Sequence, residues 1–174
     1  MKNREIAYCG LFGAAALLLP VLFHLVHLGQ IFMPMYLPLV ALAFFVRPGM
    51  SALTTIVVPL LSGAVTGMPP FYPPIAPVMA VELALIAIII GVFRSLLPRT
   101  PVLTVLIPAL IIGRAANVGL MYLAASLMGL PATFVAGISF LSGWPGIVLM
   151  IVAIPAIVRL SKDRLRTTQE RKPT

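Results

Sequence analysis

The stretch PVMAVELALIAIIIGVFR, residues 77–94, decides the fold class of this chain. Glu82 is its only charged residue before the terminal Arg94. At 1.5 Å per helical residue, a run of this length nearly crosses a bilayer core of about 30 Å. The whole chain of 174 residues is 61% hydrophobic and only 9% charged, unlike any soluble domain of this size. We therefore predict an all-α, polytopic membrane protein.

Similar apolar segments recur along the chain, and they predict six transmembrane helices in one bundle. Lys and Arg residues flank these segments on alternate sides only, whereas the loops 24–32, 67–77 and 129–142 contain none. Cytoplasmic loops retain cationic residues, so we expect both termini to lie on the cytoplasmic side. We expect the protein to be located in a plasma membrane of prokaryotic type. The expected helices cover about 5–23, 33–46, 50–66, 77–94, 102–127 and 142–160, and the flanking cations are Lys2, Arg4, Arg47, Arg94, Arg99, Arg159, Lys162, Arg164, Arg166, Arg171 and Lys172.

The chain shows no internal repeat or linker, so we expect a single domain over residues 1–174, with a short basic cytoplasmic tail at about 161–174. The tail holds much of the formal charge of +8. Such a tail can contact anionic lipid headgroups or an acidic partner. Because it lacks aromatic residues and a folded module, nucleic-acid binding is the poorer interpretation.

Two charged residues, Glu82 and Arg114, lie in the middle of predicted spans. A charged side chain near the bilayer centre costs on the order of 3 kcal/mol on insertion scales, so it faces the protein interior, pairs, or contacts a ligand. Asn117 lies one turn from Arg114 on the same helix face. These three residues form either a ligand site or an ion pair that sets helix register, and the two interpretations are compatible.

The uncharged loops carry aromatic and polar residues that suit the walls of a small-molecule pocket. Five prolines between positions 67 and 77 favour a stiff, extended segment, which loses little conformational entropy when a ligand binds. The alternative is that these loops are interfacial connectors, where Tyr, Phe and Trp are common. The candidate residues are His24, Gln30, Phe32, Tyr36, Phe71, Tyr72 and Trp144, with the aromatic side chains as apolar or stacking walls.

The pattern of the remaining residues argues against catalysis and against a metal site. His24 and His27 lie three residues apart, but no third His, Cys or acid accompanies them, so we expect no metal. The chain has neither a Gly-rich phosphate-binding loop followed by Lys nor a nucleophile elbow. We therefore expect no enzyme activity and no cofactor in this chain.

Small residues share one face of the first predicted helix. Ala7, Gly10 and Ala14 lie at spacings that let a second helix approach closely. This face can dock a partner subunit, or it can pack inside the six-helix bundle. The sequence leaves both interpretations open.

Several motifs, in order along about residues 5–160, resemble the S components of energy-coupling-factor (ECF) transporters. The block from Gly29 to Leu39 is similar to that family's Pro-Met-His-Ile-Pro-Val type sequence, although Tyr36 stands where His is common. The small residues of the first helix differ from the family's usual Ala-x-x-x-Ala. The other matching motifs are Phe23-His24, Pro59–Ser62, Thr66–Pro70, Glu82, Gly113-Arg114 and Trp144–Gly146.

The resemblance implies a substrate-binding subunit that captures a vitamin or related micronutrient from outside. A transmembrane T component and two cytosolic ATPases, which use ATP, would supply the energy, and the outer loops would gate the pocket. Glu82, Arg114 and Asn117 would anchor the ligand, and folate, pantothenate, pyridoxine-like, thiamine-like and corrinoid compounds all remain candidates. The alternatives are a stand-alone secondary carrier and a membrane scaffold without a ligand.

Overall fold

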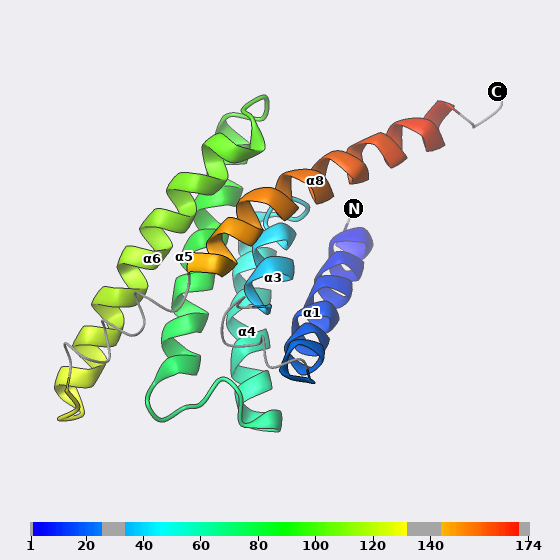
Figure 1. Ribbon diagram of the computed structural model, residues 1–174. Coiled ribbons are helices and arrows are strands. Elements are labelled where there is room, and N and C mark those ends of the chain that lie inside the picture. Colours follow the sequence, from blue (N-terminus) through cyan, green and yellow to red (C-terminus); the bar gives the residue numbers. More distant parts are fainter. Residues whose placement is uncertain (1, 26–33, 132–143, 171–174) are drawn as a thin grey trace.

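The computed structural model describes residues 2–25, 34–131 and 144–170, and side chains within 3–23, 34–131 and 144–161 (Figure 1). All regular secondary structure in these ranges is helical, as predicted. The helices are α1 (Lys2–Leu25), α3 (Tyr36–Leu42), α4 (Pro48–Thr66), α5 (Ile75–Leu96), α6 (Val102–Leu127) and α8 (Trp144–Glu170).

Five of these helices, all except α3, are long and apolar enough to cross a membrane. Their bounds agree with the predicted segments to within about two residues at most ends, because Pro and Gly residues mark those ends. Pro48 lies at the first position of α4, and Gly67 ends that helix in the left-handed conformation. The chain is therefore a multi-helix membrane protein in its described part.

The prediction for residues 33–46 is wrong in length, because α3 has only seven residues. A helix of seven residues is about 10 Å long and cannot span a bilayer. The chain before Pro48 is extended at Arg47, and α3 ends in a tight turn in which the Phe44 amide donates to the Ala41 carbonyl oxygen. The segment is apolar on all sides, and it is buried in the bundle rather than exposed to lipid.

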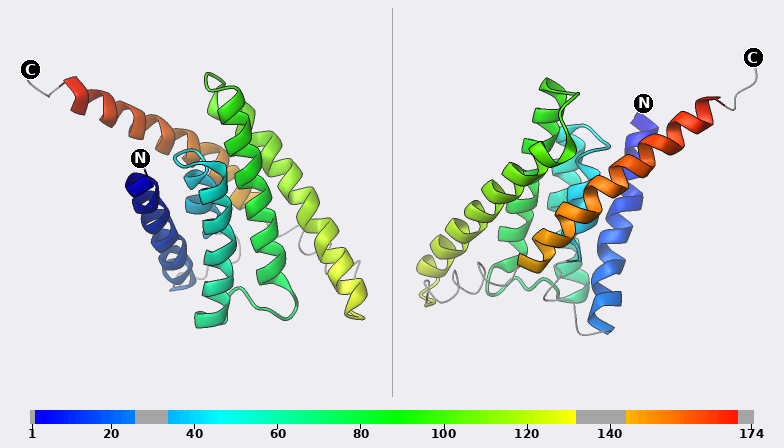
Figure 2. Two further views of the ribbon diagram at one scale, coloured as in Figure 1. Left: turned by 180° about the vertical axis from the view of Figure 1, so that it is seen from behind. Right: turned by 45° about the horizontal axis from the view of Figure 1, so that its top comes forward.

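The bundle is organised around α3, α4, α5 and α6. Helices α4 and α5 pack along each other, as do α5 and α6, while α3 contacts α1, α4, α5 and α8 (Figure 2). Helix α1 lies at one side against α3 and α4, and within its described side chains only Gly13 and Ala16 are buried. The core is thus formed mainly by α3 and the helices that surround it.

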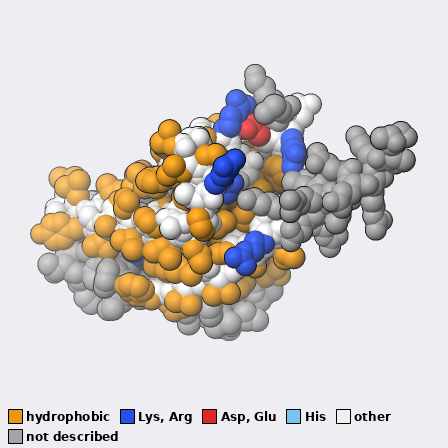
Figure 3. All heavy atoms as spheres, turned by 90° about the horizontal axis from the view of Figure 1, so that it is seen from above, with side chains coloured by type: hydrophobic (Ala, Val, Ile, Leu, Met, Phe, Trp, Pro, Cys, Tyr) orange, Lys and Arg blue, Asp and Glu red, His pale blue; other side chains and the backbone are white. Residues whose placement is uncertain are grey.

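Both described chain ends lie at the same end of the bundle (Figure 1). Seen from that end, several Lys and Arg side chains lie near the middle of the surface, and a largely hydrophobic surface extends to one side of them (Figure 3). Helix α8 continues to Glu170, whereas its apolar part stops at Ser161. The prediction that the helix itself ends near Leu160 is therefore wrong, because its basic continuation is also helical.

An ion pair joins α1 to the start of α4 at this end. The Arg47 guanidinium donates to both carboxylate oxygens of Glu5, with its Nη2 atom 2.8 Å from Oε2. These hydrogen bonds raise the pKa of Arg47. Beside them the Phe45 ring stacks on the rings of both Tyr8 and Phe12. This ion pair and these ring contacts hold the start of α1 against the bundle. Few other described residues of α1 are buried.

Close packing between α4 and α5 depends on Gly91. A Cβ atom at Gly91 would lie 2.7 Å from Cγ, 2.8 Å from Cβ and 2.9 Å from Cα of Pro48. Because the Pro48 ring and backbone cannot rotate away, the start of α4 would have to move.

We expect Gly91→Ala to destabilise the protein by about 1–3 kcal/mol, the usual cost of overpacking. The apparent melting temperature of the detergent-purified protein measures this effect. Gly119→Ala in α6 is the matched control, because a Cβ atom there meets nothing within 4 Å, and helix propensity favours Ala over Gly by about 1 kcal/mol. Equal melting temperatures for the two variants would contradict the close packing.

Candidate functional site

Four polar side chains from three helices meet in the interior of the bundle. Tyr36 is the first residue of α3, Glu82 lies in α5, and Arg114 and Asn117 lie in α6. All four are buried, with 1% of Glu82 and 8% of Arg114 exposed. The structure thus brings together the three charged or amide residues that the sequence predicted, and it adds Tyr36 to them.

The Glu82 carboxylate is the centre of this polar cluster. Its Oε2 atom accepts hydrogen bonds from the Tyr36 hydroxyl at 2.5 Å and from Asn117 Nδ2 at 2.7 Å. Its Oε1 atom lies 3.3 Å from Arg114 Nη1, which closes a buried ion pair. Among the described contacts the carboxylate only accepts hydrogen bonds, which is the arrangement of an ionised carboxylate. Glu82 and Arg114 therefore pair with each other in this structure.

The two α6 residues reach Glu82 because α5 and α6 cross closely at Gly113. Arg114 and Asn117 are three residues apart and share a helix face. A Cβ atom at Gly113 would lie 2.4 Å from Cγ1 of Ile86 and 3.7 Å from Cγ of Glu82. The sequence motif Gly113-Arg114 marks this position, but the need for glycine follows only from the distance between the two helices.

Tyr36, which the sequence predicted as an apolar or stacking wall, makes a polar contact in this structure. Its ring is buried, and its hydroxyl donates to the Glu82 carboxylate. Buried Tyr hydroxyl groups usually find a hydrogen-bond partner, so the presence of one polar acceptor in a neighbouring span was the signal for this contact. The residue links α3 to α5 through a polar contact.

The proline-rich connection between α4 and α5 is fixed to α4. The Ser62 hydroxyl donates to the carbonyl oxygen of Met68 at 2.7 Å, and the Thr66 hydroxyl donates to the same oxygen at 3.1 Å. A Cβ atom at Gly63 would lie 2.6 Å from the Pro69 carbonyl oxygen and 2.9 Å from the Phe71 ring. This connection is therefore held against α4 by hydrogen bonds and close packing.

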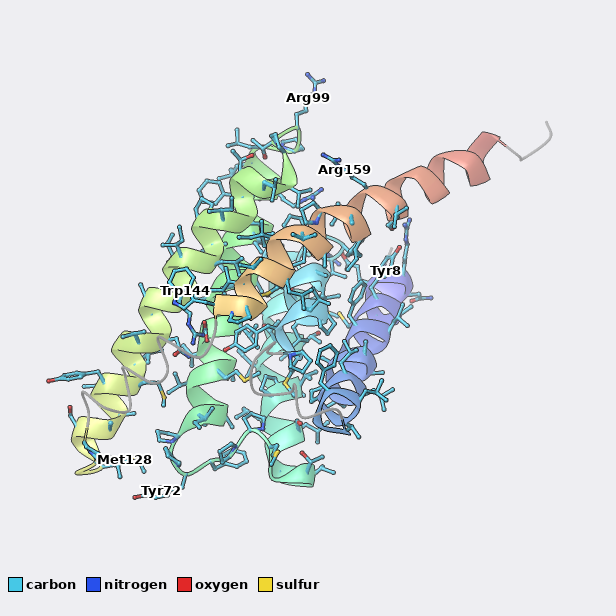
Figure 4. The ribbon with its side chains drawn as sticks, in the orientation of Figure 1. Tyr8, Tyr72, Arg99, Met128, Trp144 and Arg159 are labelled. Carbon is cyan, nitrogen blue, oxygen red and sulfur yellow. The ribbon has the colours of Figure 1, made fainter. Side chains whose placement is uncertain are left out.

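Of the other predicted wall residues, Phe71, Tyr72 and Trp144 have described side chains, and all three are exposed. Tyr72 is exposed at the end of the bundle far from Arg99, and Trp144, also half exposed, lies at the start of α8 (Figure 4). The backbone of His24 lies in the last turns of α1, and its side chain is not described. Gln30 and Phe32 lie outside the described residues.

The small-residue face of α1 points away from the described bundle. Ala7, Gly10 and Ala14 are exposed, and a Cβ atom at Gly10 would meet nothing within 4 Å. The packing of α1 on α4 uses Gly13 instead, where a Cβ atom would lie 3.4 Å from Val58. Within the described part of the chain, close packing against another helix of the bundle therefore does not explain why these three residues are small.

The chemistry of the polar cluster is that of a binding or structural site. A carboxylate, a guanidinium, an amide and a phenol offer both donors and acceptors in a low-dielectric interior, where such contacts are strong. The described residues hold no group of three His, Cys, Asp or Glu side chains arranged to bind a metal ion.

Comparison with known proteins adds no relative: no protein-family model, curated protein or solved structure matches this chain.

We expect Glu82→Leu or Arg114→Met alone to destabilise the protein by about 3–5 kcal/mol, because each leaves an uncompensated buried charge. The double variant should recover much of this loss, since it removes both charges. Thermal unfolding of the four proteins in one detergent measures the coupling. Additive losses would show that the two side chains act independently.

We expect Gly113→Ala to lower the melting temperature as well, because the added methyl group overlaps Ile86. The size-compensating variant Gly113→Ala/Ile86→Ala should lose less stability than the sum of its single variants. A loss equal to that sum would rule out the contact between Gly113 and Ile86 as the cause.

Proposed function

We propose that this chain is the substrate-binding S component of an ECF-type importer, which captures a vitamin or related micronutrient from outside. The observation that carries the proposal is the buried network of Tyr36, Glu82, Arg114 and Asn117 inside helices apolar enough to span a membrane. Removing each ion from water costs several kcal/mol. Charged groups placed within transmembrane segments commonly mark a site for a ligand or an ion.

The position of the network supports a site reached from the uncharged end of the bundle. Glu82 lies about two turns from the start of α5, which begins just after the proline-rich connection. In our proposal this end faces outward, and both termini and the arginines at the opposite end face the cytoplasm. Residues 34–47, including α3, serve as the second of six passages and return the chain to the cytoplasmic side.

The network supports binding rather than catalysis, so the chain acts as a non-enzymatic subunit of one domain. Energy would come from two cytosolic ATPases that use ATP, through a T component. The exposed small residues Ala7, Gly10 and Ala14 on α1 are the proposed contact with that component.

A stand-alone secondary carrier is the second candidate. Glu82, the one buried carboxylate among the described side chains, favours it, because proton coupling needs such a group. The two candidates differ in their energy source. Uptake into proteoliposomes should require the T component and ATP in the first case, and a proton gradient alone in the second.

Native mass spectrometry of the detergent-purified protein with a panel of vitamins tests the proposal directly. We expect one vitamin to be retained and to be displaced only by its analogues. Tyr36→Phe removes one donor of the network and should weaken binding about tenfold or more, since hydrogen bonds to charged groups contribute about 1.5–3 kcal/mol.

Tyr122→Phe is the matched control, because Tyr122 is exposed on α6, and its binding should equal that of the unaltered protein. Equal weakening of binding in both variants would show that the Tyr36 hydroxyl does not contribute specifically to ligand binding. If no vitamin binds, but Glu82 and Arg114 are still coupled in thermal unfolding, the network has a purely structural role.

A further inference from the structure

The connection between α3 and α4 is held by side chains from the first half of α1. The Phe45 ring of this connection stacks on the rings of Tyr8 and Phe12, with ring centroids 5.5 and 5.4 Å apart. Arg47, at the end of the connection, forms the ion pair with Glu5. We call these residues the clasp: Glu5, Tyr8 and Phe12 of α1, and Phe45 and Arg47 of the connection.

The ion pair is the part of the clasp that is open to solvent. The Arg47 side chain is 64% exposed, whereas that of Glu5 is 15% exposed. Among the described side chains, no second ion pair joins α1 to another helix. The neighbouring Arg4 donates to the Tyr8 hydroxyl within the same helix. Dissolved salt weakens exposed ion pairs by screening them, so the attachment of α1 has one contact that conditions outside the bundle can change.

Beyond the clasp, α1 is attached along a narrow line of small residues. Gly13 and Ala16 are its buried residues among the described side chains. They face α4 and α3, the helices that α1 contacts. Because small side chains bury little apolar surface, the first half of α1 depends on the clasp for its attachment.

The clasp also anchors one of the two ends of α3. The first residue of α3, Tyr36, is fixed by its hydrogen bond to Glu82. Phe45 and Arg47 follow the last turn of α3, and both are held by α1. A helix of seven residues has little stability of its own. The order of α3 is therefore linked to the position of α1.

We propose that the clasp is a conformational switch that the Glu5–Arg47 ion pair keeps closed. When the pair opens, the first half of α1 separates from the bundle, and α3 loses the anchor at its last turn. Helices α4 and α5 stay together, because they pack closely on each other at Pro48 and Gly91. The switch connects the end of the bundle where Arg47 lies with Tyr36 in the interior, and it is independent of vitamin binding.

Cys9 supplies a direct readout of the position of α1. It is the one cysteine of the chain, is partly buried, and shares a helix face with Gly13 and Ala16 at steps of four and three residues. The test is the rate at which N-ethylmaleimide labels the detergent-purified, full-length protein, followed by intact mass. Glu5→Gln should raise this rate about two- to fivefold, as expected for the loss of a partly exposed ion pair.

Hydrogen–deuterium exchange of the same proteins tests the link to α3. In Glu5→Gln, amide exchange should become faster in residues 36–46 and remain unchanged in residues 52–62 of α4. An increase in NaCl from about 0.05 M to about 1 M, which shortens the screening length several-fold, should raise the labelling rate of the unaltered protein. It should leave the rate of Glu5→Gln unchanged, since that variant has no pair to screen.

Two variants separate the ion pair from other effects of charge. Arg4→Gln is the matched control, because the described contacts of Arg4 stay within α1, and it should change the labelling rate by less than about 1.5-fold. The charge exchange Glu5→Arg/Arg47→Glu keeps the net charge and should return the rate to that of the unaltered protein.

The switch would be overturned by an unchanged labelling rate in Glu5→Gln, or by a rate in the unaltered protein that does not respond to salt. Equal increases in exchange over residues 36–46 and 52–62 would also overturn it, because they would show a general loss of stability. Faster labelling of Cys9 with unchanged exchange in residues 36–46 would refute the link between α1 and α3.

Discussion

The packing of the bundle interior depends on the contacts of the Glu82 carboxylate. This carboxylate accepts hydrogen bonds from Tyr36 of α3 and from Asn117 of α6, and pairs with Arg114 of α6. A carboxylate in a low-dielectric interior needs such partners, because leaving it without them costs several kcal/mol. The relative positions of α3, α5 and α6 are therefore coupled: a movement of one helix changes the environment of a buried charge.

This coupling explains why a helix as short as α3 occupies the centre of the fold. Seven residues provide few backbone hydrogen bonds, and an isolated helix of that length is unstable in water. Apolar packing on all sides and the contact from Tyr36 to Glu82 hold it in place. The proline-rich connection, fixed by Ser62, and the close crossing at Gly113 leave α5 little freedom to move away. A change at one contact of Glu82 would thus affect three helices together.

The parts of the fold that could be predicted from the sequence are those with local signals. Pro and Gly residues mark the ends of α4, and the apolar length of α5 and α6 made them recognisable as spans. The short length of α3 could not be predicted from the sequence. An all-apolar run has no hydrophobic period that distinguishes a short buried helix from a transmembrane helix. The continuation of α8 beyond Leu160 could not be predicted, because a change from apolar to polar composition also marks the end of a transmembrane helix.

The candidate site shows the same division between local and long-range information. Charges within apolar segments made Glu82 and Arg114 evident, and their helical spacing added Asn117. The hydroxyl contact of Tyr36 depends on a residue 46 positions away, and the requirement for glycine at position 113 depends on how closely α5 and α6 approach. Neither distance is encoded in a local pattern. The residues that bear charge can thus be predicted from a membrane sequence, whereas the partners that neutralise that charge follow from the packing of the helices.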